Sequence, residues 1–236
     1  MSSRQEEHIV GGGKIRSIIL GLNDGLISTF TLLVGVAAAT ITTLGSNAIV
    51  IITGLAAMVS GAISMGLGEY ISSKSEYNYI KNELKKERAE IELFPEEEKE
   101  EVREIFENMG LKGELLNSSV DTITSNKQVW FEFLSKSELG LEEPENPIWG
   151  AILTFLSFIF GSFLSLFTYF FNIGLISLVL SSIISFLMLF VVGILKTKIT
   201  GENKIKSGFE MVIIGIVAFI ASYAIGTVLE QLIITI

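Results

Sequence analysis

Three side chains that can bind a metal ion lie inside long apolar stretches of this sequence. Asp24 lies in a stretch from about Ile15 to Ala39, roughly 12 Å of helix beyond Arg16. Met65 and Glu69 are one helical turn apart in the next stretch, so they share a helix face. Ionised residues inside apolar helices cost roughly 2.5–3.5 kcal/mol and usually mark pathways or buried pairs. Methionine sulfur beside carboxylates favours transition metals over Mg²⁺ and Ca²⁺. The alternatives are that Met65 only packs and that Glu69 only reaches the membrane interface.

Glutamates form two further carboxylate faces in the polar middle of the chain. Glu83, Glu87 and Glu90 follow i, i+4, i+7 spacing, and Glu97, Glu101 and Glu104 repeat it. Such faces could gather divalent cations, but composition alone favours a solvated charged face, because lysines and arginines lie among the glutamates.

Several kinds of chemistry are excluded by composition. The chain has no cysteine, and its one histidine, His8, lies in a polar N-terminal tail. No EF-hand, Walker-type loop, dinucleotide fingerprint or nucleophile–base pair is recognisable. We therefore expect no enzyme and no resident cofactor, and any metal must be held by oxygen or methionine sulfur.

The apolar residues that surround Asp24 and Met65 predict a membrane protein. Mean hydropathy is +0.56, and a spanning helix needs ~20 mainly apolar residues. Five stretches reach that length: about Ile15–Ala39, Ala48–Ser72, Pro147–Phe170, Ile173–Leu195 and Ser207–Leu232. We expect an all-α polytopic protein in three parts: a tail with spans 1 and 2 (1–72), a soluble three-helix insert (73–146), and spans 3 to 5 (147–236).

Lysine and arginine predict the orientation, since they are retained on the cytoplasmic side during insertion. With a cytoplasmic N-terminus, the inner segments 1–16, 73–146 and 196–206 hold three, ten and four basic residues, which together are all 17 in the chain. We therefore expect the insert in the cytoplasm and the C-terminus on the outer side.

The insert should fold as short helices. A first helix continues from span 2 to Phe94, Pro95 begins a second that ends at Gly110, and further turns run from about Leu111 to Leu139. The insert carries the chain's acidic excess, with 19 acidic residues against ten basic ones. Its expected partners are cations, and we expect no nucleic-acid partner.

Two strings resemble signature stretches of the vacuolar iron transporter family: Gly21 to Ser28 (GLNDGLIS) and Gly61 to Ser72 (GAISMGLGEYIS). The resemblance implies a homodimeric five-helix transporter that exports Fe²⁺, and often Mn²⁺, from the cytosol in exchange for protons. It implies that Asp24 and Met65 line the route, with Glu69 as a third member. It also implies a metal-gathering set in the insert: Glu87, Glu90, Glu98, Glu101 and Glu138.

The chain departs from the family pattern in two places. The family's adjacent methionines in the insert fall on Leu134 and Ser135, and a second-span glutamate of some members falls on Ala57. The first departure weakens the expectation of a soft, iron-selective site in the insert. Two other functions stay open: transport of another cation or small solute with a purely structural insert, and a membrane-anchored metal buffer or sensor. The short tail favours a prokaryotic cell membrane over a vacuolar one.

Overall fold

The structure is a computed structural model that describes residues 12–44, 47–141 and 144–235. Arg4 and His8 lie outside these residues. Most of the described residues lie in helices and none lies in a strand, which confirms the all-α prediction. Five helices are long and apolar enough to cross a membrane, as predicted: α1 (Gly12–Leu44), α2 (Ala48–Leu93), α6 (Pro147–Leu166, followed by the short helix η1, Phe167–Phe171), α7 (Leu175–Thr200) and α8 (Lys204–Thr235).

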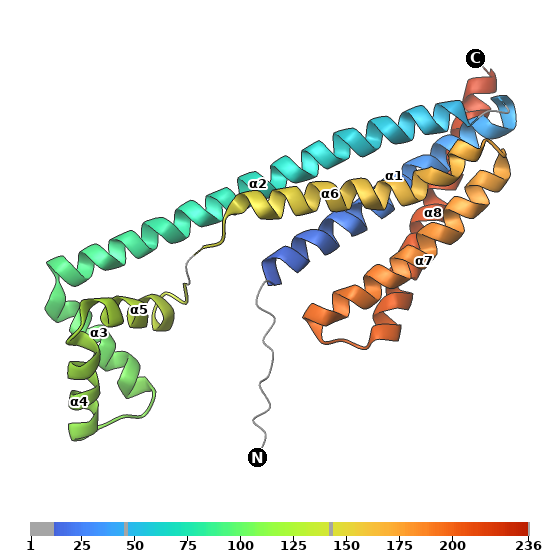
Figure 1. Cartoon of the computed structure of the whole chain (residues 1–236). Coiled ribbons are helices and arrows are strands. Elements are labelled where there is room, and N and C mark those ends of the chain that lie inside the picture. Colours follow the sequence, from blue (N-terminus) through green and yellow to red (C-terminus); the bar gives the residue numbers. More distant parts are fainter. Residues whose placement is uncertain (1–11, 45–46, 142–143, 236) are drawn as a thin grey trace. The chain divides into compact units, whose positions relative to one another are not determined.

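The chain forms two compact units. The membrane unit comprises Met1–Ile71 and Ile148–Ile236, and the insert unit comprises Ser72–Pro147. Helix α2 has 46 residues and belongs to both units without interruption (Figure 1). The first helix expected of the insert is therefore the continuation of the second span.

In the membrane unit, α7 and α8 form a hairpin that packs against α1 (Figure 1). Apolar side chains of three helices fill the space beside this hairpin, and Phe30 of α1, Leu166 of α6 and Leu178 of α7 belong to one buried cluster. The ring of Phe30 meets that of Phe186 edge to face, with centroids 5.5 Å apart. These contacts fix α1, the helix that carries Asp24, within the unit.

Glycines bring the backbones of α1 and α6 into direct contact. A methyl group at Gly161 would lie 2.6 Å from the carbonyl oxygen of Leu22, and one at Gly25 would meet the backbone of Phe158. Small residues permit such close approach between membrane helices. Backbone contact with α6 therefore fixes the position and the tilt of α1 relative to α6.

Hydroxyl groups join α6 to α7 inside the unit. Ser181 donates to the carbonyl oxygen of Ser165 at 2.6 Å, and Thr168 donates to that of Ser177 at 2.9 Å. Asn47, which precedes α2, donates from Nδ2 to the carbonyl oxygen of Tyr169 at 3.1 Å. Each bond satisfies a polar group that is out of reach of water.

The insert unit adds three short helices to the end of α2: α3 (Pro95–Asn108), α4 (Gly113–Thr124) and α5 (Lys127–Ser137). Their core contains Val102, Val120, Trp130 and Leu134. The segment expected as one run of turns from Leu111 to Leu139 is two helices, because the side chain of Asn126 accepts hydrogen bonds from the amides of Gln128 and Val129 and begins α5.

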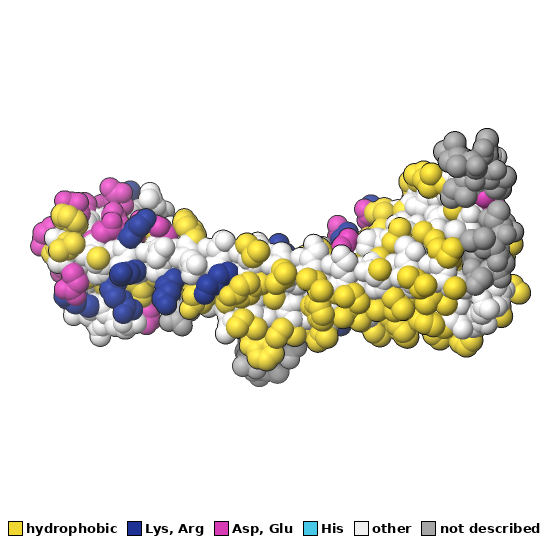
Figure 2. Space-filling view, turned by 90° about the horizontal axis from the view of Figure 1, so that it is seen from above, with side chains coloured by type: hydrophobic (Ala, Val, Ile, Leu, Met, Phe, Trp, Pro, Cys, Tyr) yellow, Lys and Arg dark blue, Asp and Glu magenta, His cyan; other side chains and the backbone are white. Residues whose placement is uncertain are grey.

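The two units differ in surface chemistry. On the face shown in Figure 2, hydrophobic side chains cover most of the membrane unit, whereas Lys, Arg, Asp and Glu gather on the insert unit. This contrast is expected if lipid surrounds one unit and water the other.

Candidate functional site: a polar cavity in the membrane unit and a carboxylate cluster in the insert

A cavity of about 440 Å³ opens between α1, α2 and α6 in the membrane unit. It brings together Asp24 and Met65, the two residues predicted to line a metal route. The full lining is Asp24, Ser28, Thr29, Leu32, Ala57, Gly61, Ser64, Met65 and Phe158.

The local folding of each helix explains how the polar side chains converge. Asp24 and Ser28 are four residues apart on α1, and Gly61 and Met65 have the same spacing on α2, so each pair shares a face. The Phe158 ring lies directly against Gly61, and a methyl group added at Gly61 would overlap the ring. Ala57 also lines the cavity and presents only a methyl group, at the position where the resemblance implies a glutamate in some family members.

Glu69 does not line this cavity and stands one turn further along α2. Ser17 of α1, itself buried, donates a hydrogen bond of 2.9 Å from Oγ to Glu69 Oε1. Ser17 precedes Asp24 by seven residues, or two helical turns, and therefore lies on the same side of α1. The structure thus adds Ser17 to the predicted residues, and its helical spacing from Asp24 was the sequence signal for it.

The five predicted glutamates of the insert come from three helices. Glu87 and Glu90 belong to α2, Glu98 and Glu101 belong to α3, and Glu138 is the residue that ends α5. Glu87 is 3% exposed and Glu98 is 5% exposed. These two are therefore not part of a solvated charged face.

Burial and mutual repulsion raise the pKa of three of these carboxyl groups. Burial, followed by the charges of Glu138 and Glu98, raises the pKa of Glu87 to about 8. Burial and then the charge of Glu101 raise the pKa of Glu98 to about 7. The pKa of Glu138 also rises to about 7, through burial and then Glu101. All five glutamates appear in these mutual effects, so they lie within one electrostatic cluster.

In the part of the chain that the structure describes, no basic group offsets the raised pKa values of Glu87, Glu98 and Glu138. Glu87 Oε1 and Glu98 Oε2 are buried without a hydrogen-bond partner. Among the described residues, no three acidic or histidine side chains are already arranged to hold a metal ion. A cation bound between Glu87 and Glu98 would satisfy both unpaired oxygens, and further carboxylates of the cluster would have to move toward it to complete a ligand set.

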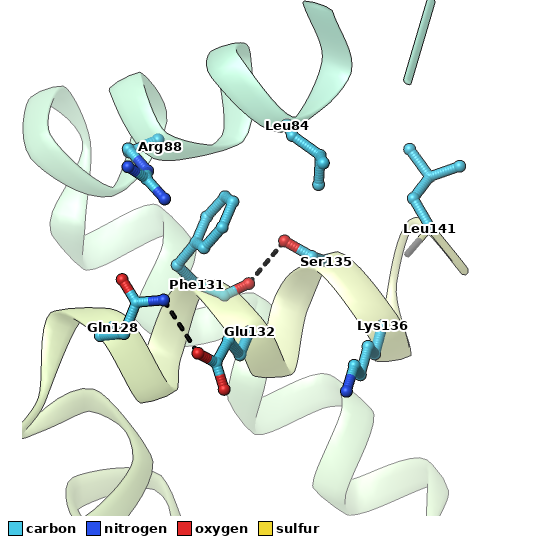
Figure 3. Close-up of a pocket in the computed structure, with 8 residues that line it drawn as sticks. All are labelled: Leu84, Arg88, Gln128, Phe131, Glu132, Ser135, Lys136 and Leu141. Carbon is cyan, nitrogen blue, oxygen red and sulfur yellow. Dashed lines mark hydrogen bonds between the residues drawn. The ribbon is translucent and has the colours of Figure 1, made fainter. Parts of the chain in front are cut away.

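Leu134 and Ser135, which occupy the family's methionine positions, have other roles. Leu134 is part of the insert core. Ser135 donates to the carbonyl oxygen of Phe131 at 2.6 Å and lines a cavity of about 430 Å³ beside Arg88, as Figure 3 shows. Neither residue supplies sulfur, so the cluster offers oxygen ligands alone.

These features define a multi-pass α-helical membrane protein with a polar cavity among its spans. A sequence model of the VIT family matches residues 15–227. Vacuolar iron transporter 1 of Arabidopsis thaliana is 34% identical over 229 residues, covering 96% of this chain and 90% of the relative. The chain belongs to the VIT family.

Relatives from other organisms match the chain with similar identity and coverage. Vacuolar iron transporter 1 of Tulipa gesneriana is 33% identical over 234 residues, covering 98% of this chain and 93% of the relative. The vacuolar iron transporter of Plasmodium berghei (strain Anka) is 31% identical over 242 residues, covering 98% and 87%. These relatives are named as transporters and the family is not enzymatic, which confirms the expectation that the chain is not an enzyme.

Proposed function

We propose that this chain is a transporter of divalent transition metal, carrying Fe²⁺ and also Mn²⁺ out of the cytosol in exchange for protons. Membership of the VIT family, and relatives that are named iron transporters, support transport of iron. Proton exchange, Mn²⁺ and the direction of transport are parts of the proposal.

The observation that carries the proposal is the pairing of Asp24 and Met65 in one cavity among membrane helices. A carboxylate supplies charge to a divalent cation, and a thioether adds preference for transition metals. Hydroxyl groups of Ser28 and Ser64 line the same cavity and provide further oxygen ligands. Glu69, held by Ser17, stands one turn away from Met65 and forms the next ligand position along the route.

Exchange follows from competition for the same carboxylates. A carboxylate must lose its proton to bind metal, so metal binding releases protons and protonation releases metal. Protons that arrive from the outer side would discharge the metal from Asp24 and reset the site.

The glutamate cluster of the insert would supply metal to this route. Its ligands are all oxygen, which suits divalent cations generally and gives little selectivity for iron. Under this proposal, the choice of transition metal is made at Met65 and the insert raises the local concentration of cations.

A second copy of the chain would complete the membrane cavity. Ser28 and Ser64 are exposed on the surface of the protomer, next to Asp24. Polar groups at this depth would otherwise face hydrocarbon, which is costly. Residues of α2 such as Ile52, Val59 and Ile63 form an exposed apolar face beside them. Homodimerisation through this surface would cover both.

The proposed orientation places the N-terminus and insert in the cytoplasm and the C-terminus outside. It rests on the distribution of all 17 basic residues. The relatives are named as vacuolar proteins, and the expectation of a prokaryotic cell membrane stays a prediction.

Flux through proteoliposomes tests the function. With an acidic interior, the parent protein should take up Fe²⁺ and Mn²⁺ faster than Ca²⁺, and the interior should become less acid as metal enters. Asp24→Asn should lower Fe²⁺ uptake at least tenfold, because the amide cannot carry the charge that a divalent ion requires.

Glu210→Gln provides a matched control, since it also removes a carboxylate from a span but lies outside the cavity. Equal transport by Asp24→Asn and the parent would refute the assigned site. Metal binding without uptake in the parent would instead identify a buffer or sensor.

A further inference from the structure

A second cavity of the membrane unit has a composition unlike that of the metal route. It measures about 280 Å³ and lies among α1, α7 and α8. Its lining is Arg16, Ile19, Leu20, Asn23, Val192, Lys196, Ile199, Thr200 and Met211. Apolar side chains form its walls, and two cations stand among them.

Helix geometry concentrates this lining on two facing stripes. Residues 16, 19, 20 and 23 follow i, i+3, i+4, i+7 spacing on α1, and residues 192, 196, 199 and 200 follow i, i+4, i+7, i+8 spacing on α7. Each stripe has one basic residue near a helix end. Arg16 is in the second turn of α1, and Lys196 is near the end of α7. The cavity is therefore a seam between two spans with both cations at one end.

The positive charge in this seam is poorly compensated within the protein. Arg16 makes no ion pair with any residue that the structure describes. Lys196 has Glu202 at 3.7 Å, a long pair in which the Glu202 side chain is half exposed, so their attraction is weak. An anion placed between Arg16 and Lys196 would meet two available cations.

An amide oxygen deeper in the seam also lacks a partner. Asn23 Oδ1 is buried and accepts no hydrogen bond in the described structure. Buried polar atoms are normally satisfied, so the Asn23 oxygen is available to accept a hydrogen bond from a molecule bound in the seam. A ligand with an anionic group, a hydroxyl or ammonium donor and an apolar portion would satisfy every feature of the lining.

We propose that this seam binds an anionic phospholipid, with its phosphate between Arg16 and Lys196. One acyl chain would lie along Ile19, Leu20 and Ile199, and a polar hydrogen of the headgroup or glycerol region would reach Asn23. Basic pockets between spans suit anionic headgroups, and the bilayer supplies the chains. Free phosphate is a poorer occupant, because it has no apolar portion to cover the apolar walls.

This site is separate from the metal route although both use α1. Asn23 and Asp24 are consecutive, so their side chains leave the helix about 100° apart. Asp24 lines the cavity with α2 and α6, whereas Asn23 lines the seam with α7 and α8. The lipid proposal therefore does not depend on the proposed transport function.

Native mass spectrometry of the full-length protein tests the proposal. The protein would be delipidated in neutral detergent and titrated with phosphatidylglycerol, or with phosphatidylcholine as the zwitterionic comparison. The parent should bind the first phosphatidylglycerol at least tenfold more tightly than phosphatidylcholine. Equal affinity for the two lipids would overturn the proposal.

Charge variants locate the binding. Arg16→Gln and Lys196→Gln should each weaken phosphatidylglycerol binding roughly fivefold, as expected for ~1 kcal/mol per basic residue near an anionic lipid. Lys198→Gln removes the same charge from an exposed position of α7 outside the seam and should have no effect. If Lys198→Gln weakens binding as much as Lys196→Gln, the attraction is only general and the proposal fails.

A steric variant tests the seam without changing charge. Leu20 is 41% exposed at the seam, so Leu20→Trp can fold normally while filling the space for an acyl chain. Its phosphatidylglycerol affinity should fall with the melting temperature of the lipid-free protein unchanged. Unchanged affinity would contradict the seam as the lipid site.

Inorganic phosphate gives the last comparison. At the same concentration as the lipid, it should not displace phosphatidylglycerol. Displacement would show a simple anion site and overturn the lipid assignment.

Discussion

Asp24 and Met65 line one cavity with chemically different side chains, a carboxylate and a thioether, so their proposed roles can be separated by substitution. In the proposed function, Asp24 would supply the charge that a divalent ion requires, and the thioether of Met65 would discriminate among ions. Both residues could be selected from the sequence because an aspartate is out of place in an apolar helix and because the surrounding strings resemble a family.

Replacing Met65 by leucine should remove the sulfur while preserving side-chain volume. We expect Met65→Leu to lower Fe²⁺ uptake about tenfold, a loss of roughly 1.4 kcal/mol, with an unchanged melting temperature. Met58→Leu makes the same exchange two turns earlier on α2, outside the cavity, and should transport like the parent. Fe²⁺ uptake by Met65→Leu at the parent rate would remove sulfur from the mechanism.

The burial of Glu87 and Glu98 could not be predicted from the sequence. Their spacing marked them as candidates, but a solvated helix face has the same spacing, and only the packing of α2, α3 and α5 together makes them buried. Ser17 was missed for a related reason, since its partner Glu69 is 52 residues away in the chain.

The raised pKa values make the stability of the insert depend on pH. The ordinary glutamate pKa is near 4.5, whereas Glu87 has a pKa of about 8 and Glu98 a pKa of about 7 in the folded protein. The folded state therefore holds more protons than the unfolded state between these values. This contribution to stability is fully present below pH 4.5 and is lost as pH rises through 7 to 8.

Glu87→Gln should consequently stabilise the metal-free insert at pH 8, by roughly 2 kcal/mol, and change it little at pH 5. Trp130 in the insert core reports unfolding by urea if Trp149 is replaced by phenylalanine. Glu104→Gln, at an exposed position of α3, serves as the control and should be neutral at both pH values. A stabilisation equal at pH 5 and pH 8 would contradict the assigned titration.

Among the helices, the contact of α1 with α6 is the closest to the metal route. A methyl group at Gly161 would lie 2.6 Å from the Leu22 carbonyl oxygen and 3.0 Å from the Leu26 amide nitrogen. Both are backbone atoms, so the helices would have to separate.

Gly161→Ala should therefore destabilise the membrane unit by about 1–3 kcal/mol and lower its melting temperature. Gly68→Ala is the matched control, because a methyl group there meets nothing within 4 Å and alanine favours the helix. A melting temperature for Gly161→Ala at or above that of Gly68→Ala would show that the close contact is not tight.

Helix number and type were predictable because a span requires about 20 apolar residues and each stretch met that length. The division of the insert's last segment into α4 and α5 was not predicted, since it depends on Asn126 capping a new helix where several residues permit a turn. Which helices pack together also depends on glycine positions whose partners cannot be read from one sequence.

For the whole molecule, the basic residues make orientation a testable property. The chain has no cysteine, so single cysteines can report their side of the membrane. Lys198→Cys should react with a membrane-impermeant maleimide only after cells are opened, whereas Asn172→Cys, between η1 and α7, should react in intact cells. The reverse pattern would invert the proposed topology.

The helices around the cavity that holds Asp24 and Met65 differ in how tightly they are packed. Backbone contact fastens α1 to α6, whereas α2 rests on the Phe158 ring at Gly61 and on the Leu33 and Leu166 side chains at Gly54. Side chains can change rotamer, but abutting backbones cannot yield without parting. We therefore expect access to alternate through displacement of α2, so spin labels on α2 and α6 should change separation with metal while labels on α1 and α6 should not. Constant separation of the α2 labels would place the moving part elsewhere.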